Sequence, residues 1–249
     1  MYRMTILISA LGMAALAGDL GARQGGGPAA PQTTHAAAEP APTPDAARLW
    51  RGTIAYRVTV GADTTGADTA VWAVRDGVLS ATDRMHLAGS TAVVESRMSL
   101  PGLAPVSDVE TRTGATGSIE VRIAYADGRV RGMVSVAGNQ APVDDAAPVG
   151  TYDQAALAPV IAALPLRTRA VWTVPAYSPY VRRVTPYHVS VGEVETLPTP
   201  MGPVRAYRVT VSGGMAEMLF WFSEAEPRWE VRGEIPALGV KIEPRSRTP

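Results

Sequence analysis

From residue 49 onward the chain alternates apolar and polar side chains with a period of two. In the stretch 54–60 every second position is Ile, Tyr or Val, and the stretch 119–125 repeats the pattern. Because successive side chains of a β-strand point to opposite faces, this period predicts strands with one buried and one solvated face. The dipeptide Asp127-Gly128 between two alternating runs predicts a two-residue β-hairpin turn.

The remaining pattern predicts a mainly β protein with one exception. The segment 154–164 carries apolar residues at helical spacing, with Asp153 placed to cap it and Pro159 inside it, so we expect a helix that is kinked or begins late. The chain is expected to form a curved antiparallel sheet or half-open barrel of about ten strands with one short central helix. Further strands are predicted over 69–75, 79–87, 91–99, 106–113, 130–136, 184–191, 204–211, 217–223 and 228–235.

The first 17 residues have the layout of a secretory signal peptide. Arg3 precedes an apolar run, 5–17, that ends in the small-residue pattern Ala15-Leu16-Ala17. As a helix the run is about 20 Å long, shorter than the roughly 30 Å hydrocarbon core of a bilayer. An uncleaved anchor or a buried helix is the alternative. Residues 1–17 are therefore predicted to direct export to the periplasm or outside the cell.

The next segment, 18–48, differs from the rest of the chain in composition. It is rich in Gly, Ala and Pro and lacks aromatic residues, so it is predicted to be a disordered linker. Residues 49–249 are then a single domain, and the protein is not expected to be integral to the membrane.

Charge and cysteine content exclude several classes of function. The chain has 23 basic and 23 acidic residues, which argues against a nucleic-acid partner. It has no Cys and only 3 His, which excludes thiolate chemistry and leaves little material for a metal site. Without disulfides, stability has to come from sheet pairing and burial alone.

No catalytic or cofactor motif is present. The sequence contains no G-x-S-x-G, G-x-x-x-x-G-K-[ST], G-x-G-x-x-G or H-E-x-x-H pattern. His86 and His188 lie in strand candidates on or near the polar parity, and we expect both to be solvated, although a triad built from distant residues stays open. We therefore predict that the protein is not an enzyme and has no cofactor.

Paired acidic residues are the next candidates. Continuing the alternation past 187–191 would bury Glu193 and Glu195, at a high cost in free energy. A bulge or strand end at Gly192 would turn Glu193 outward instead, and this is the favoured interpretation. If Glu193 and Glu195 were buried, this pair would be the best candidate for acid–base chemistry or for binding a cation. Two other acidic pairs, 108/110 and 144/145, are expected to be solvated, the latter in a loop.

Aromatic residues suggest a ligand site. Trp172, Tyr177 and Tyr180 surround a Pro-rich segment after the predicted helix, and 218–222 is apolar on both faces. Such a strand has to be covered on both faces, by the predicted helix or by a bound ligand. We take Trp172, Tyr177, Tyr180, Phe220, Trp221 and Glu193 as the candidate ligand-binding residues.

The C-terminal two-thirds resembles the DUF3108 family of exported bacterial proteins. The resemblance rests on the runs Ala163-Leu164-Pro165-Leu166 and Val171–Tyr177 (VWTVPAY), on Val191–Thr196 (VGEVET), and on a Pro-x-Gly turn followed by a strand. Here Glu193 follows Gly192 directly, a tighter spacing than in the family. The resemblance implies a curved antiparallel β architecture in the cell envelope and supplies no catalytic residues. A looser similarity to the half-barrel lipoprotein carriers of the periplasm (LolA/LolB-like) suggests lipid binding, but no motif carries it.

These observations lead to one main hypothesis for function. We expect an exported, non-enzymatic envelope protein that binds a lipid or other apolar small molecule, or an envelope protein. The alternatives are a structural or interaction module with a filled core and, less favoured, an outer-membrane barrel, which 2 Phe in the whole chain and the central helix argue against.

Overall fold

The computed structural model describes residues 38–62, 64–115 and 117–249, and within them sixteen strands form one sheet. Mainly β architecture is thus confirmed, but the expected number of about ten strands is wrong. The strand order is β1-β11-β12-β13-β14-β15-β16-β2-β3-β4-β5-β6-β7-β8-β9, and β10 also pairs with β11. The two shortest strands, β1 (Glu39–Pro40) and β10 (Tyr152–Asp153), pair with β11 in parallel.

The long strands form two antiparallel meanders. The first comprises β2 (Gly52–Val60), β3 (Thr64–Arg75), β4 (Val78–Leu87), β5 (Ser90–Ser99), β6 (Ala104–Gly114), β7 (Gly117–Ala126), β8 (Arg129–Val136) and β9 (Asn139–Ala146). The second comprises β11 (Val171–Ser178), β12 (Arg183–Leu197), β13 (Val204–Ser212), β14 (Met218–Ser223), β15 (Glu230–Ile235) and β16 (Val240–Thr248). Antiparallel pairing of β16 with β2 joins the two meanders into one sheet.

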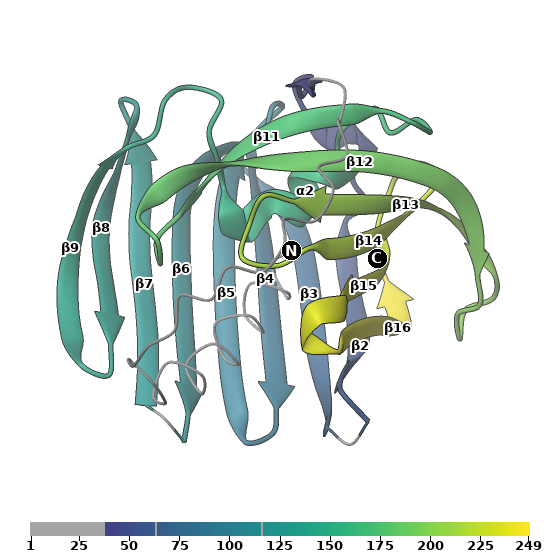
Figure 1. Ribbon diagram of the computed structural model, residues 1–249, viewed down its shortest axis with the longest axis horizontal. Coiled ribbons are helices and arrows are strands. Elements are labelled where there is room, and N and C mark those ends of the chain that lie inside the picture. The colour runs from purple at the N-terminus through teal and green to yellow at the C-terminus, as the bar shows by residue number, and fades with distance from the viewer. Residues whose placement is uncertain (1–37, 63, 116) are drawn as a thin grey trace, which may run out of the picture.

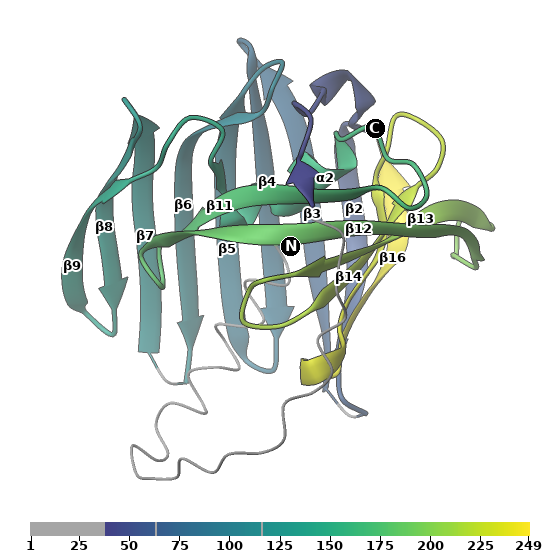
Figure 2. The same ribbon diagram turned by 45° about the horizontal axis from the view of Figure 1, so that its top comes forward.

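The sheet is strongly curved and is not closed by a backbone ladder. β11 and β12 run across the face formed by β3 to β7 (Figures 1 and 2). The short helix α2 (Leu157–Ala162) lies between these two parts of the sheet (Figure 1). This arrangement agrees with the expected half-open barrel with one central helix.

Helix α2 begins late, as its proline predicts. A 3₁₀ turn, η2 (Gln154–Ala156), precedes it, and the Asp153 side chain accepts a hydrogen bond of 2.7 Å from the Ala155 N–H. All residues of α2 are buried, which explains why the segment is apolar. Asp153 thus caps the 3₁₀ turn at the start of the predicted segment, whereas the N-cap of α2 itself is Ala156, which makes no side-chain cap hydrogen bond.

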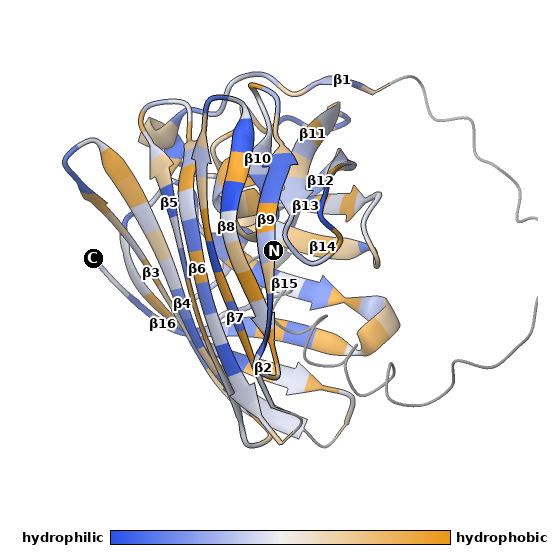
Figure 3. Cartoon of the chain, turned by 90° about the vertical axis from the view of Figure 1, so that its left-hand side faces the viewer, coloured by the Kyte–Doolittle hydropathy of each residue, from blue (hydrophilic) through white to orange (hydrophobic). Residues whose placement is uncertain are grey.

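The hydrophobic pattern follows the pleat. Apolar and polar residues alternate along β7 (Figure 3), and the apolar ones are the buried ones. The predicted hairpin turn joins β7 and β8, and Asp127 and Gly128 both have positive φ, 52° and 70°. Two positive φ values are the signature of a type I′ turn, which matches the twist of the flanking strands.

Three strands that the sequence pattern missed contain proline. Pro142 lies in the edge strand β9, Pro175 of β11 is paired with Pro186 of β12, and Pro244 of β16 sits at a register shift. Proline has no N–H to donate, so it is tolerated at edges and bulges. As a consequence, Asp144 and Asp145 lie in a strand, which corrects their expected loop position.

The domain also begins earlier than composition predicts. Glu39 and Pro40 pair with β11, and the backbone N–H of Asp45 donates to the Ala163 carbonyl at 3.0 Å. Ala46, in the 3₁₀ turn η1 (Ala46–Arg48), is only 4% exposed. Residues 39–48 therefore belong to the folded domain rather than to a disordered linker. The predicted signal peptide and the linker as far as residue 37 lie outside the described residues.

Candidate functional site

Two of the predicted ligand-binding residues, Trp172 and Phe220, lie in the main hydrophobic core. They are 4% and 0% exposed, and Phe220 stacks on Phe222 with 5.6 Å between ring centroids. Residues of α2 belong to the same core, in agreement with the interpretation that the helix helps to cover this strand. Both rings are therefore in contact with the chain's own side chains.

Trp221 points to the opposite face of β14, where charged side chains cover it. The guanidinium groups of Arg208 and Arg232 lie over its ring, 5.9 and 5.4 Å from the centroid. Its Nε1–H donates to the Glu195 carboxylate at 3.1 Å. Trp221 is consequently only 5% exposed, although it is on the outer face.

Glu193 is on the surface because β12 contains the expected bulge. The register with β13 shifts between Val191 and Val194. The Glu193 side chain is 73% exposed, and its carboxylate lies 4.0 Å from the Arg169 guanidinium. His86 and His188 are exposed too, as expected. Glu193 thus has no buried environment that would make it an acid–base group.

A buried polar cluster on β6 was missed at the sequence level. Asp108 and Glu110 were expected to be solvated, but they are 1% and 2% exposed, and Arg112 is 6% exposed. The Arg112 Nε–H donates to Glu110, and the Ser96 hydroxyl donates to Asp108 at 2.7 Å. The signal that could have identified the cluster is the register of the β6–β7 hairpin, which places these residues opposite the apolar 119–123.

The cluster continues through tyrosines to β10 and β11. Tyr125 donates to Asp153, and the rings of Tyr125 and Tyr177 meet edge to face at 6.3 Å. Tyr180 lies beneath the Arg112 guanidinium, 5.4 Å from the ring centroid. Oδ2 of Asp108 is buried and has no hydrogen-bond partner in the described part of the chain.

Burial has a strong effect on the two aspartates. Removal from water raises the pKa of Asp153 to about 6, against the hydrogen bonds from Tyr125 and Ala155 that lower it. Burial also raises the pKa of Asp108 well above its ordinary value, and the nearby Asp153 adds to the effect. Burial likewise raises the pKa values of the Tyr125 and Tyr180 hydroxyls. Proton uptake by Asp108 and Asp153 therefore favours the folded state.

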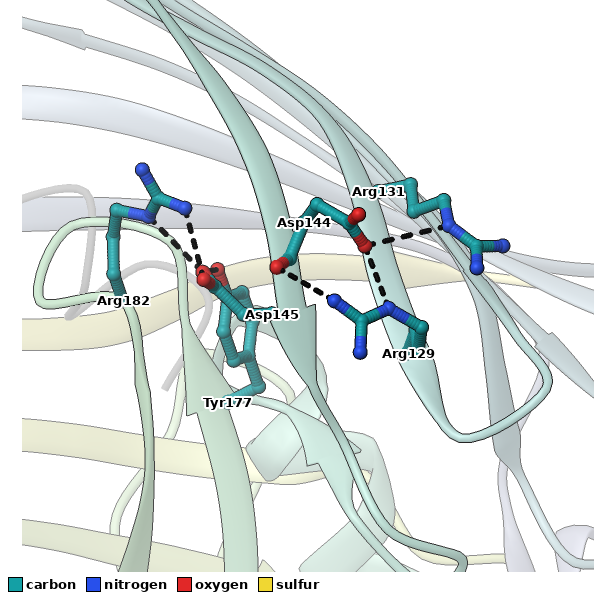
Figure 4. Close-up of polar contacts among 6 residues, drawn as sticks. All are labelled: Arg129, Arg131, Asp144, Asp145, Tyr177 and Arg182. Atoms are coloured by element: carbon teal, nitrogen blue, oxygen red, sulfur yellow. Dashed lines mark hydrogen bonds and ion pairs between the residues drawn. The ribbon is translucent and has the colours of Figure 1, made fainter.

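Side chains join the β9 edge to the β11–β12 turn, and Figure 4 shows these contacts. The carboxylate of Asp145 accepts hydrogen bonds from Tyr177 at 2.6 Å and from Arg182 at 2.8 and 3.0 Å. The bonds from Arg182 are the largest factor that lowers the pKa of Asp145. We call this junction the seam. Tyr177, one of the predicted ligand-binding residues, takes part in this seam through its hydrogen bond to Asp145.

One pocket among the described residues is a groove between the β12–β13 and β14–β15 turns. It has a volume of about 530 Å³. We call it the tryptophan groove, because Trp50 and Trp229 form its apolar walls and the Arg247 guanidinium lies over both rings, at 5.2 and 4.6 Å from their centroids. The alternation pattern gave no signal for it, because its residues come from four separate segments.

Two further pockets have volumes of about 210 and 480 Å³. None of the three is lined by any of the six predicted ligand-binding residues. Within the described ranges, no group of three or more His, Cys, Asp or Glu is arranged to hold a metal ion. In the same ranges no helix is long and apolar enough to cross a bilayer.

Comparison with known proteins gives a family and a fold. The chain is similar over 80% of its length to the crystal structure of a β-barrel-like protein of domain of unknown function DUF1849 from Brucella abortus, with 98% of that chain covered, a TM-score of 0.52 and 11% identity. No curated protein sequence matches it. The model of DUF3108, a protein family of unknown function, matches residues 52–239. The chain therefore belongs to the DUF3108 family.

Proposed function

We propose that the protein is exported, has no enzymatic activity, and binds an apolar ligand or an envelope partner on its surface rather than in its interior. The observation that supports this is a groove of about 530 Å³ on the surface, which the half-buried Trp50 lines together with one face of the otherwise buried Trp229. Trp172 and Phe220, in contrast, lie in the core and line none of the pockets described above. Ligand pockets are typically about 300–1,000 Å³.

Export is supported by the sequence of the first 17 residues, in which a basic residue, an apolar run and a small-residue cleavage pattern follow one another. The absence of enzymatic activity is supported by the absence of a catalytic motif in the sequence and by the environments of the six candidates. Glu193 is solvated, and Tyr177 is bonded to Asp145. These features fit a binding protein of the periplasm or the extracellular space.

The test combines fractionation with extraction from the native cell. We expect the protein in the periplasmic or extracellular fraction, with a mass that corresponds to cleavage after Ala17, and with an apolar molecule in the organic extract or a cross-linked envelope partner. Trp50→Ala should reduce recovery of that ligand or partner, whereas Val93→Ala, which truncates a 41% exposed side chain on β5, should not. A cytoplasmic, unprocessed chain contradicts export.

The competing function is a structural module with no ligand, and the filled core favours it as well. It predicts that neither an extracted molecule nor a cross-linked partner depends on Trp50. If neither the extracted molecule nor the cross-linked partner depends on Trp50, the protein has a structural role and the proposed binding function is wrong.

A further inference from the structure

Two arginines, Arg205 and Arg247, and two glutamates, Glu224 and Glu226, line the tryptophan groove, and both glutamates are already paired with other arginines. Arg205 pairs with Glu224 at 2.5 Å, and Arg48 and Arg228 share Glu226 at 2.6 and 2.7 Å. Arg247, in contrast, has no carboxylate partner among the described residues and lies over the two indole rings. The groove therefore offers an uncompensated cation beside apolar walls.

The stacking of Arg247 leaves its hydrogen-bonding edge available. A guanidinium that lies face-on against an aromatic ring keeps its in-plane N–H donors free, and those donors match the two oxygens of a carboxylate or a phosphate. No hydrogen bond from Arg247 to another described residue uses these donors. Two indoles hold the group, so little side-chain entropy is lost when an anion binds.

The rest of the lining is suited to hydrocarbon. Met201, 43% exposed, and Pro203 lie on one side of the groove, and Pro227 lies in the β14–β15 turn. An exposed thioether and proline rings beside two indoles make an apolar surface next to the cation. The combination is complementary to a molecule with an anionic head and an apolar chain.

We propose that the tryptophan groove binds an anionic amphiphile, with its carboxylate or phosphate at Arg247 and its apolar chain along Trp50, Trp229 and Met201. This inference rests on the proposed function and specifies the chemistry of the ligand. A neutral amphiphile supplies no negative charge to pair with Arg247, and a cationic amphiphile is repelled by the Arg247 guanidinium.

The experiment measures binding by isothermal titration calorimetry with purified protein. The probes share a twelve-carbon chain and differ in the head: dodecanoate, dodecyl maltoside and dodecyltrimethylammonium, each below its micelle concentration. We expect dodecanoate to bind at least about tenfold more tightly than the other two, because a charge-assisted hydrogen bond is worth more than a neutral one. Equal binding of the three probes overturns the proposal without any variant.

Arg247→Met and Arg245→Met form a matched pair. Both remove one positive charge from β16, but Arg245 lines a different pocket, beside Ala88 and Ser90. Arg247→Met should lose the preference for dodecanoate and still bind the maltoside, whereas Arg245→Met should keep the preference. Retention of the preference in Arg247→Met, or an equal loss in both, overturns the assignment of the head to Arg247.

Vesicles identify the source of the ligand. Binding to phosphatidylglycerol vesicles but not to phosphatidylcholine vesicles supports a membrane lipid, and binding of free dodecanoate alone supports a soluble fatty acid. A protein that binds neither vesicle type nor dodecanoate refutes the inference. Because these assays use purified protein, their failure is distinct from a failure of export, which would refute the proposed function.

Discussion

Arg228 connects three separate parts of the domain, and Arg228→Ala tests how much the domain depends on it. Its guanidinium Nη1 donates to the carbonyls of Ala162, at 3.3 Å, and Leu164, at 2.9 Å, where the helical segment ends. Its Nη2 lies 2.7 Å from the Glu226 carboxylate, and its side chain is only 5% exposed. The last carbonyls of a helix have no intrahelical partners, so this arginine satisfies the Ala162 carbonyl, while the Leu164 carbonyl also accepts from the Leu166 N–H at 2.8 Å.

The expected loss of stability follows from these contacts. Loss of hydrogen bonds from a buried charged donor should cost about 2–3 kcal/mol, because the Ala162 carbonyl loses its partner, whereas Glu226 is 42% exposed and keeps Arg48. Arg205 provides the control, since its side chain is 64% exposed and it pairs with Glu224 in the same β14–β15 turn. An exposed ion pair contributes about 0–1 kcal/mol, so Arg205→Ala should lie in that range.

Urea unfolding followed by circular dichroism and by tryptophan fluorescence measures both variants. We expect a lower midpoint for Arg228→Ala with an unchanged slope, because the change acts on the native state. Arg228→Met keeps the aliphatic stem, and it should lose nearly as much stability if the hydrogen bonds matter more than packing. A difference of less than about 1 kcal/mol between Arg228→Ala and Arg205→Ala would refute the reasoning.

Three further outcomes are expected. Folding raises the pKa of Asp153 from 3.8 to about 6, so between these pH values the folded state binds more protons than the unfolded state. The resulting stabilisation is present below pH 4 and is lost as the pH rises through 6. Asp153→Asn, which keeps the helix cap, should remove about 3 kcal/mol of this pH dependence, as measured by urea unfolding between pH 4 and 8. Ala88→Asn should raise the unfolding free energy by about 0.5–1 kcal/mol, because Ala88 has a φ of 48° and asparagine tolerates that conformation better. Phe220→Ala should lower it by about 3–5 kcal/mol, since the ring is fully buried, and Glu193→Ala should change it by less than about 0.5 kcal/mol.

Each outcome has a result that contradicts it. An Asp153→Asn protein with the same pH dependence as the wild type would mean that Asp153 does not bind its proton more tightly in the folded state. A lower midpoint for Ala88→Asn would mean that the β4–β5 turn does not tolerate the new side chain. A small effect of Phe220→Ala would indicate that this part of the interior is loosely packed.

The sequence predicts those strands that are joined to the next strand by a turn containing glycine or aspartate. Period-two alternation located β2 to β8 and most of β12 to β15, because one face of each strand packs on the core. It missed β9, β11 and β16, since Pro142, Pro175 and Pro244 interrupt the pattern. These prolines are tolerated because of their places in the sheet, at an edge strand, opposite another proline or at a register shift, and the sequence of a single strand does not show these places.

The buried polar cluster on β6 was harder to predict, because in this strand the polar residues face the interior and the apolar residues face the solvent. Along β6, Val109 is 36% exposed, and Asp108 and Glu110 on either side of it are buried. The usual assignment of apolar residues to the buried face places Val109 in the interior, so it predicts the wrong face of β6 as buried. The opposite assignment depends on Ser96, Tyr125 and Arg112, which supply hydrogen bonds or charge from three strands. Only the fold brings such partners together.

The pairing of β16 with β2 has a consequence for how the domain folds. Nearly all the other ladders join strands that are close in sequence, but this one aligns Val240 with Val60 and Thr248 with Thr53. Neighbouring hairpins form quickly, whereas a contact between distant segments has a large loop-closure entropy and slows folding. Until the last strand arrives, the free edge of β2 is open to pairing with other chains, so a chaperone that shields it should increase the yield of folded protein.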